Sequence, residues 1–268
     1  MSPDAGRARH AANSHNCQIR SVRTMPQTSL DDAVAIVTGG SVGYGHGIAR
    51  VLRDRGARVW ITARRPDRLQ AAAEELGVNA VAADVTVPAD WDRVVQTVVA
   101  DAGRVDVLVN NAGAGVNIAP LAELSDEDIA RCLATNLTGA IYGCRRVAPL
   151  LQAQGSGTII NISSICDQQA WPGFSVYGAA KAGLLAFSRH LYVEMRGHGV
   201  RVTCLTPSWG NTEFSAALGW EPGEEQTRRR MTQPDELGEI VAHVCELPAH
   251  LVMPTVTVLP LVQEIVPF

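Results

Sequence analysis

The chain has 268 residues, a formal net charge of −4 and a hydrophobic content of 46%. Its acidic balance offers no electrostatic basis for binding nucleic acid, and no apolar run reaches the roughly 18 residues that a membrane-spanning helix needs. A chain of this length and composition can bury the core of a single α/β domain.

The first 30 residues differ in composition from the rest. They carry four arginines and one acidic residue, without apolar periodicity or a signal-peptide core: Arg7, Arg9, Arg20, Arg23 and Asp4. We expect residues 1–30 to be a disordered N-terminal extension or an overextended start, with Met25 as the true first residue. A transit peptide shares this composition, but an amphipathic pattern is lacking.

Residues 31–268 alternate strand-like and helix-like runs, with no repeat or interdomain linker. Such alternation predicts a parallel sheet covered by helices on both faces, here a Rossmann-type, doubly wound α/β fold with a mainly parallel seven-stranded sheet. We expect one domain, with strands near 33–38, 57–62, 79–84, 106–110, 157–163, 200–206 and 254–259.

A glycine-rich turn follows the first predicted strand. Gly39, Gly43 and Gly45 have the spacing G-x-x-x-G-x-G and lead into a helix-like run. Residues without a Cβ allow positive φ and the close approach of a pyrophosphate, which helix N-terminal N–H groups can then bind. The spacing differs from that of the G-x-G-x-x-G fingerprint, and an ordinary strand-to-helix turn is the alternative.

The second predicted strand ends at Ala63-Arg64-Arg65. An acidic residue at this point binds the ribose 2′-hydroxyl of NAD, whereas arginine accommodates the 2′-phosphate of NADP. Arg64 and Arg65 therefore favour NADP(H) over NAD(H), because guanidinium and phosphate form charge-assisted bonds. The alternative is that both are solvated charges at the start of the next helix.

Tyr177 and Lys181 are four residues apart in a helix-like run, so they share one face. A free tyrosine has a pKa near ~10, and a neighbouring ammonium favours its phenolate. We therefore expect Lys181 to lower the pKa of Tyr177; a shift of ~3 units would correspond to roughly 4 kcal/mol. Tyr-x-x-x-Lys alone is common by chance, and the surrounding motifs give it meaning.

From about residue 32 to its end, the chain resembles a classical short-chain dehydrogenase/reductase. The resemblance rests on Thr38-Gly39-x-x-x-Gly43-x-Gly45, Asp84-Val85, Asn110-Asn111-Ala112-Gly113, Asn136 in Ala134-Thr-Asn-Leu137, and Ser164 thirteen residues before Tyr177. One motif could arise by chance, but all of them in this order are specific.

The resemblance implies an NADP(H)-dependent enzyme that interconverts a carbonyl and a secondary alcohol. Its implied catalytic residues are Asn136, Ser164, Tyr177 and Lys181. Ser164 would polarise the carbonyl, Tyr177 would act as general acid/base, and Asn136 would hold a proton-relaying water. The implied cofactor contacts are Gly39, Ser41, Val42, Gly43, Tyr44, Gly45, Arg64, Arg65, Asp84, Val85, Asn111, Ala112, Gly113, Tyr177, Lys181, Pro207 and Thr212. For Asn111, a structural role in bonding neighbouring strands stays equally open.

The chain also departs from the family pattern. Ser208 stands where glycine is usual, and Val42 stands where many NADP-preferring relatives carry a basic residue. The NADP prediction therefore rests on Arg64 and Arg65. The ending from Pro260 to Gln263 resembles certain 3-hydroxy-acid and carbonyl reductases more than fatty-acid-synthesis ketoreductases.

The residue pattern leaves the substrate open among sugars, hydroxy acids, acyl compounds and xenobiotic carbonyls. We expect pocket walls at 114–116, 165–171 and 209–220, with substrate contacts from Ser164, Cys166, Trp171, Tyr177 and Trp209. Each tryptophan, Trp220 included, fits generic packing equally well. Asp167, Gln168 and Gln169 would meet a polar substrate or face solvent.

Three further expectations concern the protein's class and setting. A non-catalytic NADP(H)-binding sensor or scaffold is the alternative to an enzyme, and dehydratases or epimerases of this fold are usually longer. Six cysteines without metal-ligand spacing predict no metal site and reduced thiols in the cytoplasm. Helices expected near 125–153 and 177–197 look apolar over much of their circumference, which predicts a homotetramer, or secondly a dimer.

Overall fold

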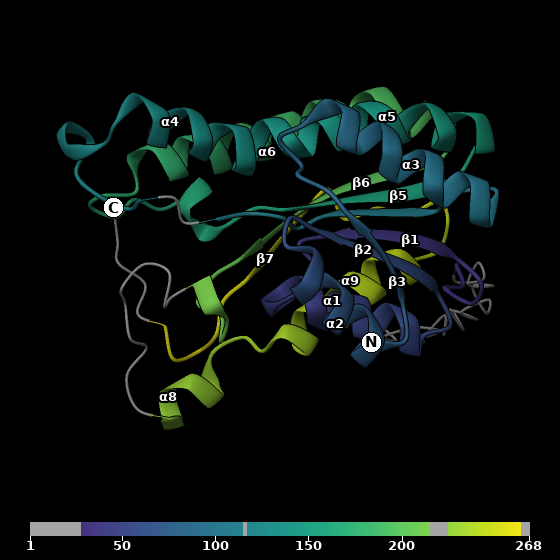
Figure 1. Cartoon of the computed structure of the whole chain (residues 1–268), viewed down its shortest axis with the longest axis horizontal. Helices are drawn as coiled ribbons and strands as arrows, with labels where there is room; N and C mark the ends of the chain where they lie inside the picture. The colour runs from purple at the N-terminus through teal and green to yellow at the C-terminus, as the bar shows by residue number, and fades with distance from the viewer. Residues whose placement is uncertain (1–27, 115–116, 215–224, 264–268) are drawn as a thin grey trace, which may run out of the picture.

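The computed structural model describes residues 28–114, 117–214 and 225–263 (Figure 1). Its strands form one seven-stranded sheet in the order β3-β2-β1-β4-β5-β6-β7, and every neighbouring pair is parallel. This confirms the predicted fold class. The strands are β1 Val34–Thr38, β2 Arg58–Ala63, β3 Asn79–Ala82, β4 Val107–Asn110, β5 Gly157–Ile162, β6 Val200–Pro207 and β7 Thr255–Val258.

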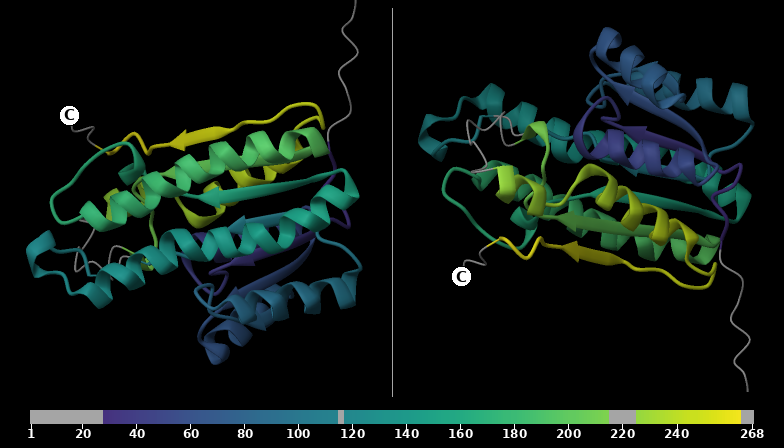
Figure 2. Two further views of the ribbon diagram at one scale, coloured as in Figure 1. Left: turned by 90° about the horizontal axis from the view of Figure 1, so that it is seen from above. Right: turned by 90° about the horizontal axis from the view of Figure 1, so that it is seen from below.

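Helices cover both faces of the sheet (Figures 1 and 2). On one face lie α1 Gly43–Asp54, α2 Pro66–Leu76 and α9 Pro234–Glu246. On the other lie α3 Pro88–Ala102, α4 Asp126–Leu133, α5 Gly139–Gln154 and α6 Ser175–Met195. The shorter helices are the 3₁₀ turns η1 Leu121–Glu123, η3 Ile165–Asp167 and η4 Arg196–His198, and α8 Glu225–Arg230.

The central strands are buried and mainly apolar because both sides of each strand face helices. In β1, Ala35 and Val37 belong to the core shared with α1, α2 and α9, while Val34 and Ile36 belong to the core shared with α3, α5 and α6. All four are at most 1% exposed. Alternation along one strand therefore fills two separate cores.

One predicted helix is wrong in detail. The run expected near 125–153 is interrupted at Ala134–Thr138, where a π-helical turn, η2, joins α4 to α5. The other long helix begins at Ser175, two residues before Tyr177, so its first turn carries the tyrosine. π-Turns within helices often occur at functional sites, and this one contains Asn136.

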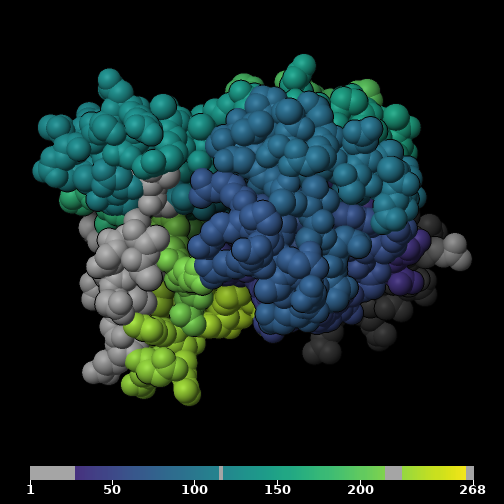
Figure 3. Space-filling view, viewed as in Figure 1, coloured from purple at the N-terminus to yellow at the C-terminus, as the bar shows by residue number. Residues whose placement is uncertain are grey.

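The carboxyl ends of the strands meet at one end of the molecule, toward which the β7 arrow points in Figure 2. α4 and α8 lie at this same end in the space-filling view (Figure 3). The strand order reverses between β1 and β4, which is where open α/β sheets bind their ligands. The fold therefore predicts the site at this end of these two strands.

The amino-terminal part of the described chain is tied to the domain. Leu30 is only 3% exposed and belongs to the α1, α2 and α9 core, and the Thr28 hydroxyl donates to the Leu247 carbonyl. The Met25 hypothesis lies outside the described residues. Over the described ranges, no helix combines the length and the apolar character needed to cross a bilayer.

Candidate active site

The glycine-rich turn lies between β1 and α1. Gly39 and Gly43 have φ of 68° and 53°, a left-handed conformation that favours glycine. A Cβ at Gly45 would lie 2.3 Å from the Gly39 carbonyl oxygen, so no larger residue fits there. α1 starts after Val42, which makes no side-chain cap to the helix. The turn is therefore a backbone cradle with helix N-terminal N–H groups, which fits a dinucleotide pyrophosphate.

Asn111 joins β4 to the glycine turn. Its side-chain amide donates to the Thr38 carbonyl at 2.9 Å, and the backbone N–H groups of Asn111 and Ala112 donate to the Thr38 hydroxyl at 3.0 and 2.9 Å. A Cβ at Gly39 would come within 3.0 Å of the Ala112 Cα. Both strand ends are thus held closely together, which supports the structural role among the two left open for Asn111.

Arg64 and Arg65 lie where β2 gives way to α2. Both side chains are exposed, and neither forms an ion pair or hydrogen bond within the described residues. Arg68, one turn into α2, pairs instead with Glu213 of the loop after β6. Two unpaired guanidinium groups therefore remain at the point where a cofactor 2′-phosphate would lie.

Asp84 and Val85 follow β3. One carboxylate oxygen of Asp84 accepts from the Thr86 backbone N–H at 2.9 Å and from the Thr86 hydroxyl at 2.7 Å. Val85 accepts from the Trp91 indole at 3.0 Å and lies against Gly139, where a Cβ would come within 2.9 Å of it. These bonds hold both residues in a fixed turn just after the carboxyl end of β3.

Tyr177 and Lys181 lie on the buried face of α6, with only 6% and 4% of their surface exposed. The Lys181 ammonium donates to the Ile162 carbonyl at 2.9 Å and lies 5.7 Å from the centre of the Tyr177 ring. The end of β5 therefore fixes the position of Lys181 beneath the tyrosine ring.

The prediction that Lys181 lowers the pKa of Tyr177 is wrong when only the protein's own residues are considered. Burial raises the pKa of Tyr177 above its ordinary value, although a hydrogen bond with Ser164 opposes the increase. Burial also lowers the pKa of Lys181 to about 8, so part of its positive charge is lost near neutral pH. Desolvation disfavours the charged form of each group and is the largest cause of both shifts. The phenol thus stays protonated at neutral pH.

Ser164 follows β5 in extended conformation and caps η3, where its hydroxyl accepts from the Cys166 N–H at 3.3 Å. The neighbouring Ser163 is buried, and its hydroxyl donates to the Lys181 carbonyl. Ser164 and Tyr177 therefore come together through the end of β5 and the first turn of α6. Cys166 is half-buried beside them, and burial raises the pKa of its thiol.

Asn136 lies in the π-turn and is 2% exposed. Its amide nitrogen donates to the carbonyls of Ala114 and Cys132 at 2.9 and 3.0 Å, and its amide oxygen accepts from the Ala114 N–H at 3.2 Å. A Cβ at Gly113 would lie 3.0 Å from that oxygen and 3.6 Å from the Lys181 nitrogen. The end of β4, the π-turn and α6 thus meet at one point.

The loop after β6 lies against the glycine turn. A Cβ at Gly43 would lie 3.3 Å from the Thr212 Cβ, and a Cβ at Gly210 would lie 2.0 Å from the Tyr44 hydroxyl. Gly210 also bridges to Thr232, which closes the base of this loop. The loop therefore contacts the cradle through Thr212 and Gly210. Ser41 and Val42 are half-buried in the same turn.

The expected substrate contacts have different surroundings. Trp171 is half-buried beside η3, and Trp209 is half-buried after β6, where its N–H donates to the Gln263 side chain at 3.2 Å. Asp167 accepts from the Thr206 hydroxyl at 2.9 Å, and exposed Gln168 donates to Thr257. Residues 115–116 and Trp220 lie outside the described ranges.

Sequence reasoning missed two aromatic residues. Phe174, three residues before Tyr177, places its ring centre 6.1 Å from the tyrosine ring, and Phe214, two residues after Thr212, places its ring centre 5.6 Å away. The i, i+3 spacing of Phe174 was a usable signal for the first. Phe214 is brought in by the loop after β6, and no local spacing indicates that contact.

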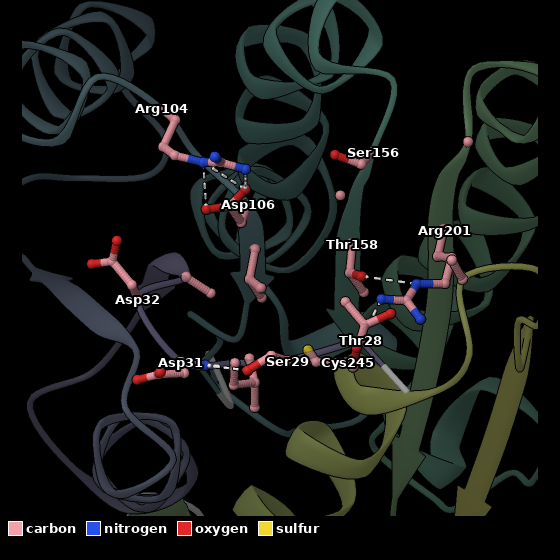
Figure 4. Close-up of a pocket in the computed structure, with 16 residues that line it drawn as sticks. Thr28, Ser29, Asp31, Asp32, Arg104, Asp106, Ser156, Thr158, Arg201 and Cys245 are labelled. Carbon is pink, nitrogen blue, oxygen red and sulfur yellow. Dashed lines mark hydrogen bonds and ion pairs between the residues drawn. The ribbon is translucent and has the colours of Figure 1, made fainter. Parts of the chain in front are cut away.

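A cavity of about 280 Å³ lies at the opposite end of the strands, near the amino ends of β1, β4, β5 and β6 (Figure 4). On one wall Arg201 bonds to the Thr158 hydroxyl and to the carbonyls of Cys245 and Leu247. On another, Arg104 pairs with Asp106. These groups satisfy one another, and ligands of such sheets bind at the carboxyl ends of the strands, so this cavity is not the candidate site.

Comparisons with known proteins agree with this geometry. A family model described as short chain dehydrogenase matches residues 33–221. An NADP-dependent 3-hydroxy acid dehydrogenase of Salmonella typhi is 36% identical over 238 residues, which cover 86% of this chain and 96% of that protein.

Solved structures give the same result. The closed form of a serine dehydrogenase in complex with NADP+ superposes with a TM-score of 0.81 at 33% identity, over 88% of this chain and 98% of that one. An actinorhodin polyketide ketoreductase variant with NADPH has a TM-score of 0.79 at 32% identity, over 87% and 98%.

Proposed function

The chain belongs to the short-chain dehydrogenase/reductase family and is an NADP(H)-dependent oxidoreductase, and we propose that four residues carry out its interconversion of a carbonyl and a secondary alcohol: Asn136, Ser164, Tyr177 and Lys181. The observation that supports this assignment best is the burial of Tyr177 and Lys181 on one face of α6, with Lys181 held by the end of β5. These comparisons favour an enzyme over a non-catalytic sensor or scaffold.

NADP(H) fits the residues present. The glycine turn would hold the pyrophosphate, Asp84 and Val85 the adenine, and Arg64 and Arg65 the 2′-phosphate. Asn111, Ala112 and Gly113, with Pro207 and Thr212, would border the nicotinamide half. When bound, the cofactor supplies or accepts a hydride.

The chain's own residues handle the carbonyl oxygen. In reduction, Ser164 donates a hydrogen bond to this oxygen and stabilises its developing negative charge. Burial keeps the phenol of Tyr177 protonated. Tyr177 then donates this proton to the oxygen. Lys181 stabilises the resulting phenolate through its ammonium.

Asn136 supports the return of a proton. Its amide N–H groups donate to the carbonyls of Ala114 and Cys132, and its amide oxygen accepts from the Ala114 N–H, so the side chain fixes the π-turn against the end of β4. In our proposal, a water that relays protons toward Lys181 is therefore held by the main chain of this turn. π-Turns alter the regular pattern of carbonyl acceptors in a helix, which suits such a role.

A panel of ketones with NADPH, and of secondary alcohols with NADP+, tests the function by absorbance of the reduced nicotinamide. We expect turnover of at least one pair in both directions. Absence of turnover across the panel, with NADPH binding verified, would favour the sensor or scaffold instead.

Cofactor selectivity gives a second test. Because Arg64 is exposed and unpaired, we expect NADPH to bind at least about tenfold more tightly than NADH, since each charge-assisted bond contributes about 1.5–3 kcal/mol. Arg64→Ala should remove most of the difference by weakening NADPH only. Titration of both cofactors measures this, with Arg53→Ala as a control outside the site. Equal affinities in the unaltered protein would contradict the prediction.

We also propose a homotetramer, with a dimer as second choice. On the two long helices from which the sequence predicts assembly, Ala140, Ala180, Leu184 and Leu191 are buried within the chain and need no partner. The remaining support comes from residues left accessible: Ala130, Leu133, Leu137, Phe187 and Val193, the last 65% exposed.

Light scattering at micromolar concentration should give about four times the mass of one chain, and Val193→Glu should shift it toward smaller species because it places a charge in the contact. A monomeric mass for the unaltered protein would contradict the proposal.

We further propose a single domain over 31–268. We also propose a cytoplasmic location, which the five described, unpaired cysteines favour.

A further inference from the structure

Aromatic rings surround the reacting phenol on two sides. Trp171 and Phe174 meet edge to face with ring centres 6.4 Å apart, and Phe174 meets Tyr177 edge to face at 6.1 Å. Phe214 lies tilted against Tyr177 at 5.6 Å. Two separate segments, the approach to α6 and the loop after β6, therefore supply one continuous aromatic wall, defined here as Trp171, Phe174 and Phe214.

This wall is not simply part of the core. Trp171, Phe174 and Phe214 are all half-buried, whereas Tyr177 is 6% exposed, and none of the three belongs to either hydrophobic core. Each residue thus keeps part of its surface accessible, in a group of rings that reaches the Tyr177 ring through Phe174 and Phe214. A planar apolar group can cover that surface in offset or edge-to-face contact.

One acidic group near the phenol, whose own pKa is raised by burial, disfavours an anionic substrate. Asp167, three residues after Ser164, acts electrostatically on both Tyr177 and Lys181 and raises the pKa of each. Lys181 donates to the Ile162 carbonyl and lies beneath the ring of Tyr177. Arg68 is paired with Glu213. Between the end of β6 and the start of α9, the arginines of the sequence are Arg228, Arg229 and Arg230 of α8.

We propose that the preferred substrate is an uncharged ketone, or its alcohol, with an aryl group a few atoms from the reacting carbon, and that Phe214 is a specificity-determining residue for it. The inference rests on the proposed oxidoreductase function. A preference for an uncharged substrate would distinguish this chain from its 3-hydroxy acid dehydrogenase relative, whose named substrate class carries a carboxylate.

Three methyl ketones that differ only at the end of the chain test this: 4-phenyl-2-butanone, 2-pentanone and 4-oxopentanoate. With NADPH, we expect kcat/KM for the phenyl ketone to exceed that for the carboxylate at least about tenfold, since ring stacking and charge repulsion act together. Phe214→Leu should lower kcat/KM for the phenyl ketone about 3–10-fold more than it lowers kcat/KM for 2-pentanone. Phe187→Leu, a half-buried phenylalanine on α6 away from Tyr177, is the control: with an unchanged mass by light scattering, it should alter neither the phenyl-to-carboxylate nor the phenyl-to-pentanone ratio of kcat/KM.

Binding is measured separately from turnover, by saturation-transfer NMR of the same ketones on NADP+-loaded Tyr177→Phe protein. The inference is supported if the phenyl ketone binds more strongly than the other two ketones and if adding Phe214→Leu weakens that binding. This holds even when the enzyme converts none of the ketones to its alcohol. Absence of turnover then contradicts the proposed function alone. Preference for 4-oxopentanoate would overturn it and would direct attention to Arg228, Arg229 and Arg230 of α8. An equal loss for all three ketones in Phe214→Leu would also overturn it.

Discussion

Tyr177→Phe is expected to reduce turnover by at least ~10²–10⁴-fold, the contribution of a general acid, while the fold and NADPH affinity are retained. The substitution deletes only the hydroxyl oxygen from a ring that is 6% exposed and is held by Phe174 and Phe214. No bond of that hydroxyl to the cofactor cradle is lost, so binding and chemistry should separate.

Stopped-time assays with a verified ketone measure turnover, and fluorescence titration measures NADPH affinity. Tyr142→Phe is the matched control, because Tyr142 lies on α5, and its loss of a hydroxyl should leave turnover unchanged. Near-normal turnover in Tyr177→Phe would place the acid elsewhere and would make the assignment of this site wrong.

Much of the fold could be predicted because buried parallel strands leave a local signal. Strands such as Val34–Thr38 and Val200–Pro207 are fully buried and lie within a residue of their expected bounds. The π-turn at Ala134–Thr138 left no such signal, because its residues continue an ordinary helical pattern. Its cause is tertiary: Asn136 reaches across to Ala114, far from it in sequence.

The candidate site was predictable where spacing along one element fixes the neighbours. Tyr177 and Lys181 share a helix face for that reason, and the glycine spacing required positive φ at Gly39 and Gly43. The contact of Phe214 with Tyr177 depends on the path of the loop after β6, so spacing along the chain could not predict it.

The protonation of the pair could not be predicted from spacing either. The four-residue interval implied attraction between an ammonium and a phenolate, but the sequence does not state how completely each group is buried. Desolvation shifts the pKa of both toward the neutral forms, and its size depends on packing from β5, η3 and the loop after β6 together.

Lys181→Met is expected to lower turnover at least about 10²-fold, the cost of removing one group that stabilises a developing oxyanion, and to weaken NADPH as well. Methionine keeps the apolar stem but removes the ammonium that donates to Ile162 and lies next to Gly113. Tyr177→Phe should lose activity alone, so the two variants differ in cofactor affinity. Unchanged NADPH affinity in Lys181→Met would contradict a role of Lys181 in binding the cofactor.

The same residue sets the pH dependence of reduction. The pKa of Lys181 is lowered by burial to about 8, so its ammonium is present below that pH and is lost above it. Without the ammonium, the phenolate formed when Tyr177 gives up its proton loses its stabilising charge, and kcat/KM for ketone reduction should fall as pH rises through about 8. The phenol itself, with its raised pKa, should add no loss in this range. In Lys181→Met the inflection should disappear, and its persistence there would assign it to another group.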